Sequence, residues 1–187
     1  MYEKTEVDKP PMQSSDEAKT EQLKLAKEQG RTYQKALEYM TKKEAHGESK
    51  AAGNYLVSYV VEEAEGMYSL QEGQLVWHNP QLENAHIEIG VQDGSDLRFL
   101  PELSVFVTVI DEKGEEIGTH QHPFLWHPWL YHYGRNWRLP GDGKYTIHVH
   151  IDPPAFMRHD KTNGKRYEEP VDVEFLNVEV KTGQKKS

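Results

Sequence analysis

The segment His86-Ile-Glu-Ile-Gly-Val-Gln92, the turn Asp93-Gly-Ser-Asp96 and the segment Leu103-Ser-Val-Phe-Val-Thr-Val-Ile110 decide the fold of this chain. In the first segment, isoleucine and valine occupy every second position, as in a strand that buries one face. The other face then carries His86, Glu88 and Gly90. The second segment is nearly all apolar and β-branched, which predicts a central strand buried on both faces. We therefore expect a β-structure built around these two strands.

The same alternation continues on both sides of this centre. About seven strands, separated by turn signals every 8 to 12 residues, predict a mainly β fold with an immunoglobulin-like antiparallel β-sandwich. The last strand changes phase at Leu176, which predicts a β-bulge. The further strands are expected at residues 55–61, 67–70, 74–77, 145–151 and from 171 onward.

The N-terminal quarter of the chain has a different pattern. Residues 1–13 are polar and contain Pro10-Pro11, so we expect a flexible tail. A capping-box pattern at Ser14 and Glu17, followed by apolar positions at steps of three and four, predicts a helical segment over residues 14–47. Gly30 is expected to weaken or divide this helix. The helix is expected to pack on its own domain, the alternative being an arm that docks on a partner subunit.

The domain plan is therefore a tail (1–13), an added N-terminal helical segment (14–47), the β-sandwich (54–181) and a lysine-rich tail (182–187), which is expected to fray. The net charge of -9 argues against a nucleic-acid partner. No cysteine is present, so any metal must be held by His, Asp, Glu or Met. The N-terminus is charged and has no apolar signal region, which predicts either a cytoplasmic protein or a leader already removed.

Residues 119–137 are expected to form a loop in which histidine and tryptophan gather. The segment holds four of the ten histidines and three of the four tryptophans, Trp126, Trp129 and Trp137. Imidazole is the commonest metal ligand, and bulky aromatics exclude water. The loop therefore predicts a metal or ligand site, the alternative being an aromatic cluster that packs on itself. Its histidines are His120, His122, His127 and His132.

Two further groups have spacings that suit metal chemistry. His86 and Glu88 lie two residues apart on a strand and so share a face, where they form either a pair of ligands or an ion pair. In Arg158-His159-Asp160 the carboxylate is placed to orient the imidazole, the alternative being a surface histidine. The pair His148 and His150 has the same spacing on a polar strand face and ranks lower.

These motifs, taken in order, resemble the bacterial Fe2+-transport family, whose members are periplasmic or lipid-anchored metal-binding proteins associated with iron permeases. The resemblance covers residues 54–181, and it implies an immunoglobulin-like fold, a homodimer and a divalent metal near the dimer interface. The motifs are Met67, Ala85-His-Ile-Glu88, Leu103–Ile110, Tyr131-His-Tyr-Gly134, Gly143-Lys-Tyr-Thr146, Arg158-His-Asp160 and Glu169-Pro170.

The resemblance also implies a ligand set. It maps the family's metal-binding positions to His86, Glu88, His132 and His159, with Met67 as a further candidate. Where the family has Met-Pro-Met, this chain reads His122-Pro-Phe124. A soft thioether is therefore replaced, and His122 or His127 is expected to substitute, giving a site suited to Fe(II), Zn(II) or Cu(II).

We therefore expect a non-enzymatic protein that binds a divalent metal ion through His and Glu, with the tryptophans limiting access of solvent. The partners implied by the family are a second copy of the chain and a membrane iron permease, in a periplasmic or other extracytoplasmic location. Two alternatives stay open. One is a β-sandwich that binds carbohydrate or peptide through the Trp/Tyr-rich loop, and the other is a metal-dependent oxidoreductase.

Overall fold

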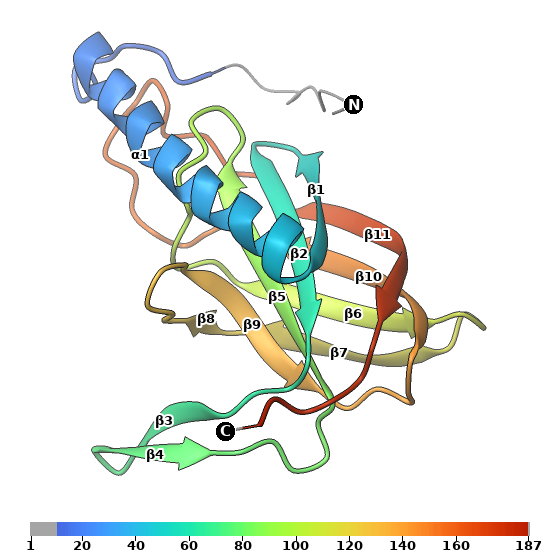
Figure 1. Cartoon of the computed structure of the whole chain (residues 1–187). Helices are drawn as coiled ribbons and strands as arrows, with labels where there is room; N and C mark the ends of the chain where they lie inside the picture. The colour runs from blue at the N-terminus through green and yellow to red at the C-terminus, as the bar shows by residue number, and fades with distance from the viewer. Residues whose placement is uncertain (1–10, 187) are drawn as a thin grey trace.

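The chain forms two antiparallel β-sheets packed face to face, with one long helix across the outer face of the first sheet (Figure 1). The structure is a computed structural model that describes residues 11–186. Residues 1–10 of the expected N-terminal tail, and Ser187 of the C-terminal one, lie outside the described residues. The mainly β fold with an added helix confirms the expected β-sandwich.

The first sheet has the strand order β1-β2-β5-β9-β8, and the second has the order β11-β10-β6-β7. A separate hairpin, β3-β4, projects from the sandwich (Figure 1). The strands are β1 His46–Ala52, β2 Tyr55–Glu62, β3 Met67–Gln71, β4 Gln74–His78, β5 Ala85–Asp93, β6 Val105–Asp111, β7 Glu116–His122, β8 Phe124–Leu125, β9 His132–Trp137, β10 Gly143–Ile151 and β11 Val171–Val180.

Strand β5 separates an apolar face from a polar one, as its alternation predicts. Ile87, Ile89 and Val91 lie in the main core between the sheets. The other face is also buried, because α1 and the segment before β9 cover it. Strand β6 differs from the prediction. Its residues alternate between buried and half-buried, because the outer face of its sheet carries no helix among the described residues (Figure 1).

The helix is shorter than the predicted segment 14–47. Helix α1 spans Thr20–Tyr39 and continues as a five-residue π-helix, Met40–Glu44. At its start the side chain of Gln22 accepts a hydrogen bond from the Lys19 N–H at 2.7 Å, so the capping box is not formed by Ser14. Strand β1 then pairs with β2 along its whole length. The sequence of β1, His-Gly-Glu-Ser-Lys-Ala-Ala, has no apolar alternation and gave no signal.

Gly30 does not divide the helix, which is continuous through it. A Cβ atom at this position would lie 1.8 Å from the carbonyl oxygen of Asp96, so α1 touches the turn after β5 here. Nearer its end, α1 packs Leu37 on Val60 and Leu130 in a small second apolar cluster. The helix therefore packs on its own domain, as expected.

The segment 119–137 is mostly strand rather than loop. Strands β7, β8 and β9 account for it, apart from residues 126–131 and Pro123. The predicted bulge is present in β11, where the register shifts between Phe175 and Val178. The tail after β11 is held rather than frayed, because Gln184 bridges to Ala64. No described helix has the length and apolar character needed to cross a bilayer.

Candidate metal centre

Strand β5 places His86 and Glu88 side by side on the outer face of the first sheet. His86 is fully buried, and Glu88 is nearly so. Two polar side chains in such a position are costly unless they are hydrogen-bonded or bind a ligand. The face is closed by the end of α1 and by the segment that precedes β9.

His132 joins this pair from the neighbouring strand. It opens β9, which runs antiparallel to β5 with Gly134 opposite Glu88. The ligand atoms of His86, Glu88 and His132 lie within 4.8 Å of one another, and all three residues are buried. Among residues 11–186 this is the only group of three or more such side chains that can hold a metal ion. Strand pairing thus unites two motifs more than forty residues apart.

The proton of the His86 ring is fixed by Asn136. The Asn136 Nδ2 donates to the Glu65 carbonyl at 2.7 Å, and its Oδ1 accepts from the Glu65 N–H at 3.3 Å. The same Oδ1 lies 2.9 Å from the His86 Nδ1. Because this oxygen can only accept, Nδ1 carries the proton. The lone pair of His86 is therefore on Nε2, which points toward Glu88.

His132 has the same tautomer for a similar reason. Its Nδ1 lies 3.2 Å from the Leu130 carbonyl oxygen, which can only accept a hydrogen bond. The Nε2 atoms of His132 and His86 lie 3.5 and 3.7 Å from the same oxygen, Glu88 Oε1. Both Nε2 atoms are buried and have no hydrogen-bond partner. Two imidazole lone pairs thus face one carboxylate oxygen, an arrangement that a cation between them would stabilise.

A small cavity of about 60 Å³ opens beside this cluster. His127 lines it, and the His127 ring lies 6.1 Å from that of His132. The His127 Nδ1 is also buried without a hydrogen-bond partner. Met40 lines the same cavity from the π-helix, a type of helix often found at functional sites. His127 and Met40 are therefore additional donors that border the same cavity as Glu88 and His132.

Glu65 and Lys185 are site residues that the sequence did not reveal. The Glu65 Oε1 lies 3.6 Å from the His86 Nε2, and its Oε2 lies 3.0 Å from the Lys185 ammonium. Lys185 also pairs with Glu62. The only signal in the sequence is an acidic run, Glu62-Glu-Ala-Glu65, which is common on protein surfaces. Burial opposes ionisation of Glu65, but His86 and Lys185 outweigh it and lower the pKa of this carboxyl.

The buried histidines are held neutral. Burial lowers the pKa of His86, against the pull of Glu65 and Asn136. Burial, together with the nearby His86, lowers the pKa of His132 to about 4. Burial likewise lowers the pKa of His122 to about 3. Neutral imidazole is the form that ligates metals. The rings of His86 and His132 can therefore bind a cation at neutral pH without first being deprotonated.

His122 is buried next to the cluster, but its ring is already engaged. The Trp137 indole N–H donates to the His122 Nε2 at 3.0 Å. This bond uses the lone pair of that nitrogen, and the remaining proton is then on Nδ1. The structure thus places His122 as a hydrogen-bond acceptor at the edge of the core. Of the two candidate substitutes for the thioether, His127 is the one that lines the cavity beside the cluster, with an Nδ1 that has no hydrogen-bond partner.

Two expected ligands lie away from the cluster. The His159 side chain is 92% exposed, and its Nδ1 lies 3.0 Å from the Glu17 carboxylate. Asp160 does not orient His159 but accepts hydrogen bonds from Ser15 and Asn163. Met67 begins the projecting hairpin and lines a different cavity. Within the described chain, therefore, His159 does not reach His86, Glu88 and His132, and Met67 lines a cavity that contains none of these three residues.

The tryptophans have separate roles. Only Trp129 lines the small cavity, whereas Trp126 is exposed and Trp137 belongs to the main core. The expectation that all three wall off the site is therefore wrong. The pair His148 and His150 is occupied by ion pairs with Asp172 on the outer face of the second sheet.

Comparisons with known proteins agree with this fold. A sequence model described as "Fe2+ transport protein" matches residues 35–181. FetP of uropathogenic Escherichia coli strain F11, as isolated, is 20% identical, with a TM-score of 0.59 over 73% of this chain and 94% of that one. A copper-bound variant of the same FetP is 22% identical, with a TM-score of 0.58 over 73% and 97%. No curated protein matches the sequence.

A third solved structure is a copper-bound variant of P19 from Campylobacter jejuni. It is 17% identical, with a TM-score of 0.60 over 74% of this chain and 97% of that one. At these identities the three solved structures show a shared fold.

Proposed function

The chain belongs to the Fe2+ transport protein family, and from this premise we propose that it binds one divalent metal ion between His86, Glu88 and His132. The ion is cargo that is held reversibly. His127 borders the same cavity and completes the coordination, with Met40 as a further donor.

One observation carries the proposal. Two buried imidazoles, each with its proton held on Nδ1, direct unpartnered Nε2 atoms at one carboxylate oxygen. In an apolar setting this arrangement leaves the lone pairs of both rings unsatisfied, which costs free energy. A divalent cation satisfies the nitrogens and the carboxylate together, so binding the metal is also a gain in stability.

The donor set favours borderline metals. Imidazole suits Fe(II), Cu(II) and Zn(II), and one carboxylate makes the site harder than a thiolate site. The family's name points to iron, and two of the structural neighbours were solved with copper bound. We therefore expect Fe(II) and Cu(II) to bind, with Zn(II) as a competitor, and we expect the protein to hold the ion without turnover.

The remaining proposals rest on family membership. We propose that the protein acts outside the cytoplasm as a homodimer with the metal near its interface, and that it passes the ion to a membrane iron permease. A dimer would also offer a place for His159 and Met67, which lie apart from the cluster within one chain.

The binding proposal is tested by metal titration of the chelator-stripped protein. We expect wild type to bind one equivalent of Cu(II), or of Fe(II) under anaerobic conditions, as measured by calorimetry and by metal analysis after gel filtration. Glu88→Gln removes the anionic ligand at nearly constant volume, and it is expected to weaken binding by at least about tenfold, because loss of a group that only supports a ligand already costs that much.

His78→Ala is the matched control, because His78 is an exposed histidine on the hairpin and its ring bonds only Gln71 among the described residues. This variant should bind as wild type does. A His86→Ala/His132→Ala double variant that keeps one tight equivalent of metal would show that the ion is held elsewhere.

A further inference from the structure

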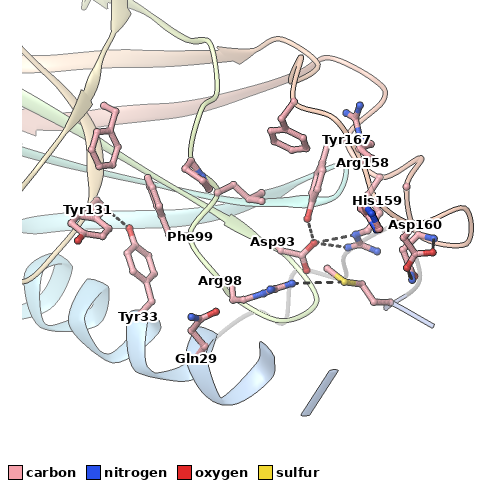
Figure 2. A pocket seen from close by; sticks show the side chains of 18 residues that line it. Gln29, Tyr33, Asp93, Arg98, Phe99, Tyr131, Arg158, His159, Asp160 and Tyr167 are labelled. Carbon is pink, nitrogen blue, oxygen red and sulfur yellow. Dashed lines mark hydrogen bonds and ion pairs between the residues drawn. The ribbon is translucent and has the colours of Figure 1, made fainter. Parts of the chain in front are cut away.

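A second and much larger cavity, of about 720 Å³, lies beside the middle of α1, where Gln29 and Tyr33 line it. It is open to solvent and is lined by α1, the segment after β5, β8, the residue before β9 and the loop between β10 and β11 (Figure 2). Its volume is in the range of small-molecule sites, which is roughly 300 to 1,000 Å³. It does not share a residue with the small cavity at the metal cluster.

One side of the cavity is an aromatic wall. Phe99 is its centre, with ring centroids 5.4 Å from Tyr33, 6.0 Å from Phe124 and 6.3 Å from Tyr131. The Tyr33 hydroxyl donates to the Tyr131 carbonyl at 2.5 Å, which ties α1 to the far end of the wall (Figure 2). Phe124 and Tyr131 are both about half exposed. Such a wall is suited to a flat or branched apolar body.

The other side carries charge, and its two carboxylates are already satisfied. Asp93 accepts from the Arg166 guanidinium at 2.8 Å and from the Tyr167 hydroxyl. Asp160 is bonded by Asn163 at 2.6 Å and by Ser15 at 2.8 Å. Neither carboxylate is therefore available to bind a cation in the cavity.

Arg98 is less well satisfied. Its Nε and Nη2 bond the buried Asp96 at 3.0 and 2.9 Å, which fixes the plane of the guanidinium. The same Nη2 also faces the sulfur of Met12 at 4.0 Å (Figure 2). A thioether is a weak hydrogen-bond acceptor, whereas a carboxylate forms strong, charge-assisted hydrogen bonds with guanidinium. A strong donor thus points into the cavity toward a partner that an anion would displace.

The lining itself carries one more arginine than aspartate. Three arginines, Arg98, Arg158 and Arg166, line the cavity against the two aspartates. The chain as a whole carries a net charge of -9. Asp96, which bonds Arg98 from outside the lining, brings the neighbouring carboxylates to three, so the preference for an anion comes from the donor geometry of Arg98 and not from a net positive charge.

We propose that this cavity binds a small organic carboxylate with an aromatic or branched apolar body. The carboxylate bonds Arg98 in place of the Met12 sulfur, and the body packs against Phe99 and Phe124. The site is separate from the metal cluster, and its occupancy does not require a metal.

The probe for this proposal is 2-naphthoate, compared with the neutral 2-naphthamide of nearly the same shape. Both are titrated calorimetrically into the full chain in the presence of chelator. We expect one saturable site for the carboxylate and binding at least about tenfold weaker for the amide, because a charge-assisted bond to guanidinium is lost.

Two pairs of variants locate the site. Arg98→Gln is expected to reduce the affinity for 2-naphthoate to that for the amide, whereas the exposed Arg138→Gln, which is outside the cavity, is without effect. Phe124→Ala is expected to weaken both probes, whereas Trp126→Ala, an exposed aromatic two residues away, changes neither. Phe124 is half exposed, so its truncation leaves the core intact.

Equal affinity for the carboxylate and the amide, or no saturable binding of 2-naphthoate, would overturn the proposal on the wild type alone. Binding that persists unchanged in Phe124→Ala would also overturn it, even if Arg98→Gln fails to fold. His86→Ala should bind 2-naphthoate as wild type does. This result separates failure of the cavity from failure of the metal cluster.

Discussion

At the scale of single residues, the site depends on where two protons are held. Asn136 and the Leu130 carbonyl keep the protons of His86 and His132 on Nδ1, so that both Nε2 atoms face Glu88. These supporting groups bond the Nδ1 atom of each ring, and they thereby decide which nitrogen can bind a metal. His86, Glu88 and His132 could be predicted as metal ligands from the sequence, because they belong to the recognisable motifs His-x-Glu and His-Tyr-Gly. It gave no sign of Asn136 or Glu65, whose roles follow from pairing across strands.

Gly134 gives a residue-scale prediction. It lies opposite Glu88, and a Cβ atom here would be 2.7 Å from Leu125 Cδ1, 3.0 Å from His86 Nε2 and 3.2 Å from His132 Cδ2. Gly134→Ala is therefore expected to displace the imidazoles and weaken metal binding by about tenfold or more, although it removes no ligand. Calorimetric titration measures the change.

Gly141→Ala is the control for this prediction, because a Cβ at Gly141 meets no atom within 4 Å. Its metal affinity should match that of wild type. A Gly134→Ala variant with unchanged affinity would mean that the ion lies away from the strand pair β5–β9.

At the scale of elements, a strand with one apolar face could be predicted from its alternation, whereas the strand without such a face, β1, was missed. Residues 86–92 and 145–151 have strict alternation and form β5 and β10. Strand β1 has no such pattern and is held in place by pairing with β2. The His/Trp segment was expected to be a loop because its prolines and aromatics hide β7 and β9. In both cases, hydrogen bonds to a neighbouring strand outweigh the local pattern.

Helix α1 gives the prediction at this scale. In an exposed helix, replacing Gly by Ala stabilises by about 1 kcal/mol. Gly30 is instead pressed on the Asp96 carbonyl, where the added Cβ would lie 1.8 Å from the oxygen. Gly30→Ala is therefore expected to destabilise the protein by about 1 to 3 kcal/mol, or to lift the start of α1 from the turn. Urea unfolding measures the change in the free energy of unfolding.

Thr32→Ala, on an exposed position of the same helix, is the comparison and should change stability by less than about 0.5 kcal/mol. An increase in stability for Gly30→Ala would show that the contact between α1 and the turn does not exist in solution.

At the scale of the whole molecule, the fold buries three neutral histidines, His86 and His132 on the outer face of the first sheet and His122 at the edge of the core. Residue motifs could be read from the sequence, but their convergence could not, because it depends on β5 lying beside β9 and on α1 covering both. Burial removes all three rings from water, and this lowers the pKa of His86, His122 and His132. His159 was expected at the site because the family resemblance implies it. A short motif gives no information on distance in the fold, so the sequence could not show that His159 is exposed.

The burial of these three histidines predicts how the stability of the metal-free protein depends on pH. The unfolded chain takes up protons on these histidines near their ordinary pKa of about 6.5. The folded chain takes them up only near pH 4 for His132 and near pH 3 for His122. Between these values the unfolded state binds more protons, so the free energy of unfolding is expected to fall as the pH is lowered from about 6.5.

The surface residue His150 has the opposite effect on the pH dependence of stability, because its hydrogen bond to Asp172 raises its pKa. Its contribution is present at low pH and is lost as the pH rises through its folded pKa, and it is small because the pair is partly exposed. Urea unfolding at pH 7, 6 and 5 measures the sum. Stability that stays level or rises toward pH 5 would contradict the neutral, buried state of the three rings.

The central claim is that the Nε2 atoms of His86 and His132 and the carboxylate of Glu88 hold one ion, and a crystal structure of the Cu(II)-loaded protein with anomalous scattering at the copper edge tests it most directly. We predict one strong anomalous peak at this cluster, about 2.0 to 2.2 Å from both Nε2 atoms and from a Glu88 oxygen. A strongest peak on His148 and His150, or one bound through an Nδ1 atom of His86 or His132, would contradict the account.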